Sequence, residues 1–223
     1  MSASPSGILD IVIQEQHWQL HPYKAAYWQE TKTLLISDLH LGKSAHFRRA
    51  GIAAPKAVEG TNTDRLISLL LHFAPTRVLL LGDLFHSDYN AVWDDWCALV
   101  RQFLPIRFEL VPGNHDILPA PRYAEAQLKM LPVRYAEGPF LFSHEPLAKD
   151  SSGSLYNICG HIHPAVQLQG SGRQKLRLPC FYFGRDAGIM PAFGAFTGLA
   201  CIPVQAQDRV YGITDTAVLE LAS

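Results

Sequence analysis

The chain has 223 residues, of which 48% are hydrophobic and 17% are charged, and its formal net charge is −1. This length allows one large domain or two small ones, and the apolar content is sufficient for a sizeable core. The near-zero charge excludes a global attraction to nucleic acid or anionic membranes, so any contact with a polyanion must come from a local patch.

The N-terminal segment and the cysteines indicate the cellular compartment. Residues 1–7 have no basic region and no long apolar run, so we interpret them as a flexible leader and not as a signal peptide. No window approaches the roughly 18 apolar residues of a membrane span, and no membrane contact is expected. The four cysteines lack zinc-type spacing and are interpreted as small buried thiols of a cytoplasmic protein: Cys97, Cys159, Cys180 and Cys201.

The first half of the chain predicts strands that alternate with helices. Short strands are expected at 8–13, 18–20, 25–28, 34–37, 77–81 and 106–111. A helix is expected at 61–73, capped by Thr61 or Asn62, and a second at 91–103 with Trp93 and Trp96 in the core. Strands that alternate with helices in this way predict parallel pairing with right-handed crossovers.

The second half predicts short strands and hairpins. Strands are expected at 140–142 and 155–159, followed by hairpins that pair 165–169 with 174–183 and 209–213 with 216–221. No linker, repeat or low-complexity segment interrupts the chain. We therefore predict an α/β fold that forms a single domain over residues 1–223, with two mixed sheets packed face to face and helices outside.

Polar side chains gather just beyond five of the predicted strands. Asp38 and His40 follow the strand at 34–37, and in extended chain the i, i+2 spacing would place both on one face. The other strands are followed by Asp83, by Asn114 with His115 and Asp116, by His144, and by His161 with His163. Because ligands of α/β sheets bind at the carboxyl ends of the strands, these groups are expected to form one site.

The donor set at these strand ends exceeds what one cation can use. A pair of cations that share a carboxylate would use it, and two such cations can clamp the oxygens of a phosphoryl displacement. Asp83 is the best candidate for the shared ligand, since it stands alone after Gly82 on a tight turn. Taken singly, His144 could be a hydrogen-bonded loop histidine and Asn114 a turn residue.

The motifs Asp38-x-His40, Gly82-Asp83, Gly113-Asn114-His115-Asp116, His144 and Gly160-His161-x-His163 together resemble the motif set of the calcineurin-like metallophosphoesterases. The resemblance implies a four-layer α/β/β/α sandwich. It implies that one metal is held by Asp38, His40, Asp83 and His163, and the other by Asp83, Asn114, His144 and His161. It also implies that His115 is the catalytic histidine and that Asp116 orients it.

A narrower resemblance covers nearly the whole chain. The runs 38–43, 82–86 and 191–198 are similar to those of the DNA-ligase-associated metallophosphoesterases. This resemblance implies a bacterial phosphodiesterase or endonuclease linked to DNA repair, with a functional association with DNA ligase and helicase. Many family members have an acidic or amide residue where this chain has His86, which could contact a substrate phosphate or support the loop.

The expected activity is hydrolysis of phosphodiester bonds, with DNA as the substrate. Lys43, His46 and Arg48, with Arg49 beside them, follow the first motif and could contact phosphates or form a solvated loop. Nitrogen and oxygen ligands without thiolate suit Mn, Fe or Zn, and the family resemblance favours Mn. The alternatives are a phosphoesterase acting on a small nucleotide or phosphomonoester, and a non-catalytic scaffold, which is disfavoured because no ligand is missing.

Overall fold

The computed structural model describes residues 7–42, 57–85, 91–148, 151–170, 174–195 and 197–222. The predicted phosphate-contacting residues lie outside these ranges: Lys43, His46, Arg48, Arg49 and His86. The leader residues 1–6 and the hairpin residue Arg173 also lie outside them.

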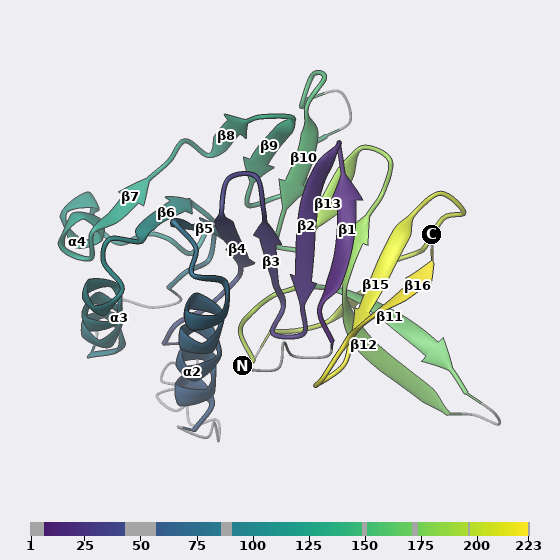
Figure 1. The fold of residues 1–223 in the computed structure, drawn as a ribbon, viewed down its shortest axis with the longest axis horizontal. Helices are drawn as coiled ribbons and strands as arrows, with labels where there is room; N and C mark the ends of the chain where they lie inside the picture. Colours follow the sequence, from purple (N-terminus) through teal and green to yellow (C-terminus); the bar gives the residue numbers. More distant parts are fainter. Residues whose placement is uncertain are drawn as a thin grey trace.

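Within the described ranges, the first sheet has seven strands whose order in space follows the sequence (Figure 1). They are β1 (Leu9–Ile13), β2 (Gln16–His21), β3 (Ala25–Trp28), β4 (Thr33–Ser37), β5 (Arg77–Leu81), β6 (Arg107–Val111) and β7 (Leu128–Met130). The pairs from β1 to β4 are antiparallel, and those from β4 to β7 are parallel. The sheet is therefore mixed. Its parallel strands are the ones that alternate with helices along the chain, as the sequence predicted.

The helices cover one face of this sheet. They are α2 (Ala57–Phe73), α3 (Ala91–Gln102) and α4 (Ala120–Glu125). The side chains that alternate along β4 and β5 divide between the two faces: Leu34 and Ile36 pack against the helices, whereas Leu35 packs against the second sheet. A strand that is buried on both faces reads as a continuous apolar run, which is how β4 and β5 read in the sequence.

Helix α2 begins four residues earlier than expected, at Ala57. Neither Thr61 nor Asn62 caps it, because both lie inside the helix, where Asn62 is buried. Glycine is unfavourable inside a helix, and the helix was therefore predicted to begin after Gly60. The packing of Leu66, Leu69 and Leu70 on the sheet outweighs that local preference.

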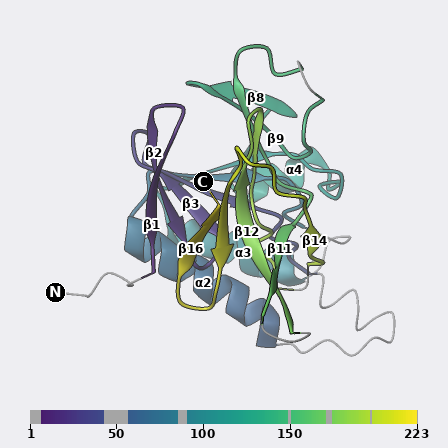
Figure 2. The ribbon, with the colours of Figure 1, turned by 90° about the vertical axis from the view of Figure 1, so that its right-hand side faces the viewer.

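The second sheet is also mixed, and its strand order does not follow the sequence. Its strands are β8 (Arg134–Glu137), β9 (Phe140–Ser143), β10 (Tyr156–Cys159), β11 (Pro164–Gln169), β12 (Lys175–Phe183), β13 (Ala187–Ile189), β14 (Ala200–Cys201), β15 (Arg209–Ile213) and β16 (Val218–Ala222). Both predicted hairpins are confirmed, as β11 with β12 and β15 with β16. The first of these hairpins extends away from the rest of the molecule, and Figure 2 shows β14 beside it.

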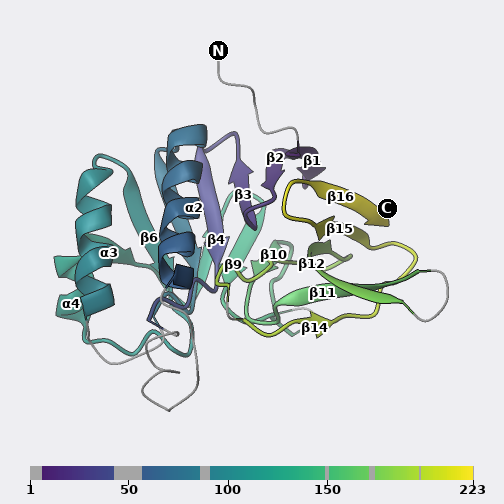
Figure 3. The ribbon, with the colours of Figure 1, turned by 90° about the horizontal axis from the view of Figure 1, so that it is seen from below.

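The two sheets face one another across a core that contains Trp18, Trp28, Phe140 and Phe181. This arrangement confirms the α/β class and the pair of mixed sheets. In the part of the chain that the structure describes, the helices lie on the first sheet alone, on the side away from the second (Figure 3). A helical layer on the second sheet is not seen there, because most of its strands are joined by short turns and loops.

The cysteines differ from the expectation at one position. Cys97, Cys159 and Cys180 are buried free thiols, as predicted, but Cys201 is exposed on the short strand β14. Burial raises the pKa of Cys159 and of Cys180 to about 12. No helix among the described residues is long and apolar enough to cross a membrane.

Candidate metal centre

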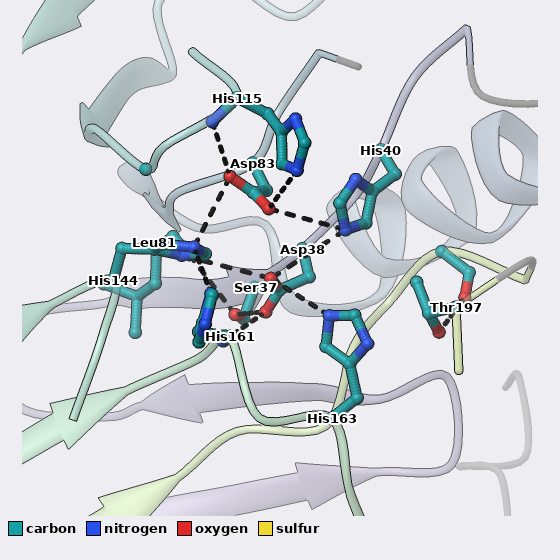
Figure 4. Close-up of polar contacts among 12 residues, drawn as sticks. Ser37, Asp38, His40, Leu81, Asp83, His115, His144, His161, His163 and Thr197 are labelled. Carbon is teal, nitrogen blue, oxygen red and sulfur yellow. Dashed lines mark hydrogen bonds and ion pairs between the residues drawn. The ribbon is translucent and has the colours of Figure 1, made fainter. Parts of the chain in front are cut away.

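The predicted ligands follow β4, β5, β6, β9 and β10, and the packing of the two sheets brings them together (Figure 4). Their backbone is not extended, in contrast to the geometry assumed for Asp38-x-His40. Asp38, His40, Asp83, His161 and His163 all have positive φ angles, between 48° and 67°. Left-handed backbone at residues other than glycine costs free energy and concentrates at functional sites.

Asp38 is buried, and its two carboxylate oxygens have different surroundings. Oδ2 accepts hydrogen bonds from the Ser37 hydroxyl and from the backbone N–H of His161, at 3.0 Å for the latter. Oδ1 is buried without a hydrogen bond of good geometry, and the ring nitrogens of His163, His144 and His40 lie 3.2, 3.9 and 4.0 Å from it. One oxygen is therefore held in place while the other faces imidazoles.

The carboxylate of Asp83 lies between two groups of ligands. Its Oδ2 is 3.6 Å from Nε2 of His40, and its Oδ1 is 3.4 Å from Nε2 of His144. Figure 4 shows the two oxygens directed to different sides. Each oxygen thus lies within 3.6 Å of a different histidine, and the role of Asp83 as a shared ligand stays a prediction.

His144 presents a bare ring nitrogen to a set of oxygens. Its Nδ1 lies 3.2 Å from the carbonyl oxygen of Leu81, an arrangement in which Nδ1–H donates. In the neutral ring Nε2 then carries a lone pair, and it lies 3.1 Å from Oδ1 of Asn114 and 3.4 Å from Oδ1 of Asp83. Nδ1 of His161 lies within hydrogen-bond distance of it, at 3.0 Å. A cation among these atoms could be coordinated by the Nε2 lone pair and by both oxygens.

Two groups of side chains could each hold a metal ion. One consists of Asp38, His40 and His163, and the other of Asp83, His144 and His161; within each group the ligand atoms lie within 4.8 Å of one another. Neutral imidazoles and carboxylates suit divalent transition metals. The buried Oδ1 of Asp38 and the bare Nε2 of His144 both fit a bound cation.

The pKa of Asp38 also reflects this environment. Burial pushes it upward, but the hydrogen bonds from His163 and Ser37, together with the charges of His163 and His144, hold it below the usual value for an aspartate. The carboxylate is thus stabilised in the ionised form that a metal requires.

Three glycines allow this packing. A Cβ added at Gly113 would lie 2.5 Å from Oδ1 of Asp83, and one at Gly160 would lie 2.5 Å from Oδ2 of Asp38 and overlap the Ser37 hydroxyl. A Cβ at Gly82 would overlap the ring of His144, and its φ of 68° favours glycine in any case. Each glycine precedes a ligand or a turn that carries one, and each removes a side chain where a ligand must lie.

His115 lies at the open side of the centre. Its side chain is 43% exposed, its backbone N–H donates to Oδ1 of Asp83 at 3.1 Å, and its Nε2 lies 3.9 Å from Oδ2 of the same residue. The ring is therefore beside the candidate metal groups and accessible to a ligand from solvent. This position agrees with a residue that acts on substrate.

Asp116 accepts hydrogen bonds from three backbone N–H groups. Its Oδ2 accepts from that of Gly113 at 2.8 Å, and its Oδ1 accepts from those of Leu84 and Phe85 at 3.0 and 3.4 Å. These hydrogen bonds tie together the loops that follow β5 and β6, and the orientation of His115 by Asp116 stays a prediction. Burial raises its pKa to about 6.

A late segment of the chain, part of the Gly- and Phe-rich run 188–198 that we expected to border the site, lies against Ser37 and Asp38. The backbone N–H of Phe193 donates to the carbonyl of Ser37 at 2.9 Å, and that of Gly194 donates to the carbonyl of Asp38 at 3.0 Å. The hydroxyl of Thr197 donates to the carbonyl oxygen of Gly194 at 2.9 Å (Figure 4). Phe85 and Phe193 are buried in the core, so neither ring is exposed for stacking with a base.

A cavity of about 330 Å³ adjoins the centre next to Asn114 and His144, with Arg134 and Glu145 among its lining residues. The cavity gives a small molecule or a segment of a polymer access to the ligand groups. The side chain of Arg134 is exposed there. Arg134 can therefore pair with an anion in this cavity, a role that was not predicted from the sequence.

Carboxylates, imidazoles and one amide gather at the carboxyl ends of the strands, from the buried Asp38 and Asp83 to the exposed Asn114, with an accessible histidine beside them. This arrangement is typical of a metal-dependent phosphoesterase. The family model described as calcineurin-like phosphoesterase matches residues 31–183. The chain therefore belongs to the calcineurin-like phosphoesterase family, and the predicted family, fold class and enzyme class are confirmed.

Solved structures agree with this assignment. The crystal structure of Pseudomonas putida nuclease MPE is similar, with a TM-score of 0.80 and 26% sequence identity over 96% of this chain and 100% of that one. Two others match less well: a protein of unknown function, AQ665 from Aquifex aeolicus (TM-score 0.41, 21% identity, 63% of this chain and 82% of that one), and the phosphoesterase Yfce from E. coli (TM-score 0.46, 12% identity, 85% and 98%). No curated protein matches the chain.

Proposed function

We propose that this protein is a phosphodiesterase that uses two divalent cations and cleaves DNA. The observation that carries the proposal is the placement of the Asp83 carboxylate between the two candidate metal groups. The first cation would be held by Asp38, His40, Asp83 and His163, and the second by Asp83, Asn114, His144 and His161.

Two cations would supply charge that activates water and offsets the charge that builds on the phosphoryl oxygens. The remaining work falls to residues of the chain. His115 is accessible and lies next to Asp83, so it can contact the phosphoryl group and hold a proton for the leaving oxygen. Asp116 would act through the loops that it ties together; direct orientation of His115 stays a prediction.

The substrate is proposed from similarity. The structural relative that matches over the full chain is a nuclease by its printed name, and three sequence runs resemble the DNA-ligase-associated metallophosphoesterases. Manganese is proposed as the native metal on the same resemblance, and the donor set would also accept Fe or Zn. A role in DNA repair, in functional association with a DNA ligase and a helicase, follows from the same resemblance.

A cytoplasmic location is part of the proposal. The cysteines of the chain are free, and none is paired in a disulfide, as is usual in a reducing compartment.

Stoichiometry and substrate are tested with purified protein loaded with Mn, Fe or Zn. Elemental analysis is expected to approach two ions per chain. One ion per chain, unchanged by Asn114→Ala or His144→Ala, would contradict the two-cation centre. His17→Ala is the matched control, since this histidine is exposed and pairs with Glu30 at 2.7 Å, away from the site.

The same preparations are tested on plasmid DNA, single-stranded DNA, RNA, a chromogenic phosphodiester and a chromogenic phosphomonoester. Cleavage of DNA together with the small diester supports the proposal. Hydrolysis of a small ester by enzyme that leaves DNA intact with every metal would instead establish a small phosphoester as the substrate. Metal-loaded protein that is inactive on all five would indicate a scaffold.

A further inference from the structure

A second cavity, of about 430 Å³, lies outside the metal centre. It is bounded by the turn between β2 and β3, by α2, and by segments of β12 and of the hairpin β15–β16. Its lining includes Tyr23, Lys24, Arg65, Leu178, Ala195 and Asp215. All of its lining residues belong to the described part of the chain.

Two cations share this cavity. Lys24 lies on the turn and Arg65 at the middle of α2, with its guanidinium 5.4 Å from the centre of the Tyr23 ring. Among the described residues, neither cation forms an ion pair with a carboxylate. Burial, followed by the charge of Arg65, lowers the pKa of Lys24 to about 8.

Like charges that share a cavity without an ion-pair partner cost free energy in the folded chain, and an anion would relieve that cost. A purely structural role explains the arrangement poorly, because an uncharged side chain at either position would avoid the repulsion. Asp215 lies on another wall of the cavity, so two positive charges and one negative charge leave a net charge of +1. A phosphodiester, with a single negative charge, matches that value.

The cavity shares a wall with the metal centre. Ala26 pairs with Leu35, so the turn that carries Lys24 lies next to the end of β4, where Asp38 follows. The segment that closes the metal centre there donates from Gly194 to the carbonyl of Asp38, and the next residue, Ala195, lines the cavity. Consecutive residues of this segment therefore contact the metal centre and line the cavity.

We propose that Lys24 and Arg65 form a second anion subsite, which binds a backbone phosphate of a nucleic acid strand whose scissile phosphate lies at the metal centre. This inference rests on the proposed function and deepens it. A polymer can occupy both sites at once, whereas a small phosphodiester can occupy one. The subsite therefore favours long substrates over short ones.

The test compares the double variant Lys24→Gln/Arg65→Gln with a control that removes the same charge elsewhere. Arg107→Gln/Lys129→Gln is suitable, since both side chains are about two-thirds exposed and pair with Glu109, and Arg107 begins β6, at the edge opposite the metal centre. For each protein, kcat/KM is measured on a single-stranded oligonucleotide and on a small chromogenic diester. Binding of the oligonucleotide is followed separately by fluorescence anisotropy in chelator, over a range of salt concentrations.

The ratio of oligonucleotide to small-diester kcat/KM is expected to fall about tenfold in the double variant and to stay at the wild-type value in the control. The salt slope of binding should fall by about 0.7, which is the contribution of one neutralised phosphate of a single strand. Lys24→Arg/Arg65→Lys, which keeps both charges, should recover most of the ratio and shows whether the fold survives substitution at both positions.

An unchanged ratio and salt slope in a double variant that melts like the wild type would overturn the subsite while DNA cleavage still stands. An equal loss on both substrates would also overturn it, since the two residues would then act through the metal centre. Wild-type enzyme that hydrolyses the small diester but neither binds nor cleaves DNA refutes the proposed substrate instead. Inorganic phosphate should inhibit hydrolysis of the small diester equally in the wild type and the double variant, because it would compete with the diester at the metal centre.

Discussion

Substitution of Gly160 by alanine is expected to damage the metal centre through packing alone. The new methyl group would overlap the Ser37 hydroxyl and lie 2.5 Å from Oδ2 of Asp38, where ordinary contacts begin near 3.4 Å. Gly160 does not have a positive φ angle, so alanine suits its backbone and the effect cannot be assigned to conformational strain. The same substitution at Gly82, whose φ is 68°, would combine steric overlap with backbone strain, so the two causes could not be separated.

The magnitude follows from what must move. Overpacking a close-packed site costs about 1–3 kcal/mol. Displacing Asp38 also weakens the hydrogen bonds that Oδ2 accepts from Ser37 and from the His161 N–H, and a hydrogen bond to a charged group contributes about 1.5–3 kcal/mol. We expect a loss of about 2–5 kcal/mol in the free energy of unfolding. Metal affinity should fall about 10–100-fold, as is usual when the groups around a ligand are disturbed.

The assay is denaturant unfolding with and without metal, combined with metal titration. Gly170→Ala is the matched control, because its new Cβ would meet only Gln174, at an ordinary 3.5 Å, and it should change stability by less than about 0.5 kcal/mol. The double variant Gly160→Ala/Ser37→Ala should cost less than the sum of the single changes, since the overlapping hydroxyl is gone. Additive costs, or a Gly160→Ala variant that binds metal as the control does, would refute the reasoning.

Three further predictions rest on single side chains. His115→Ala should keep its metal content and lose about 10²–10⁴-fold in kcat, as general acid–base residues do; loss of metal at unchanged activity per ion would contradict the assignment. His21 is buried and its Nδ1 accepts from the Tyr23 N–H at 3.0 Å; burial, then the nearby His72, lowers its pKa from 6.5 to about 4. Between pH 6.5 and pH 4 the unfolded chain therefore binds a proton that the folded chain does not. The free energy of unfolding should fall by about 3 kcal/mol as the pH drops through this range. If residues 1–223 form one domain, as predicted, unfolding should show a single transition. His21→Asn, which keeps an acceptor but does not titrate, should flatten this dependence when both proteins are measured in chelator; equal pH profiles would contradict it. Among the four thiols, Cys201 alone should react quickly with a thiol reagent in the native protein, and four fast reactions would show that the buried cysteines become exposed.

The sequence was sufficient for the elements that carry strong periodicity, and its motifs named side chains that the structure brings together in two candidate metal groups. Strands β3, β5 and the two hairpins were found nearly residue for residue, because apolar runs end in turn residues there. Elements that are short were missed: α4, β7, β8, β13 and β14. A strand of two to four residues has too few positions for a period of two to show, and its pairing is decided by tertiary contacts.

The ligands were identified from motifs, but the reasons for their geometry could not be. The left-handed backbone at Asp38 and His40 depends on contacts with Gly82, Asp83 and Leu84, which are far away in the chain. The role of Ser37 was visible only as a polar residue at the end of an apolar run. The partners of Asp116 are backbone groups, which no side-chain pattern records.

The order of strands in the first sheet has a consequence for the timing of synthesis. Because β1 to β7 lie side by side in chain order, this sheet can form progressively as the polypeptide leaves the ribosome. Asp38 is then in place early, but the His161 N–H that fixes its Oδ2 is 123 residues further along. At roughly 5–20 residues per second, that partner is made about 6–25 s later, and the closing segment at Phe193 and Gly194 later still. Both candidate metal groups therefore stay incomplete until His161 and His163 have been made, by which time the first sheet can already have formed.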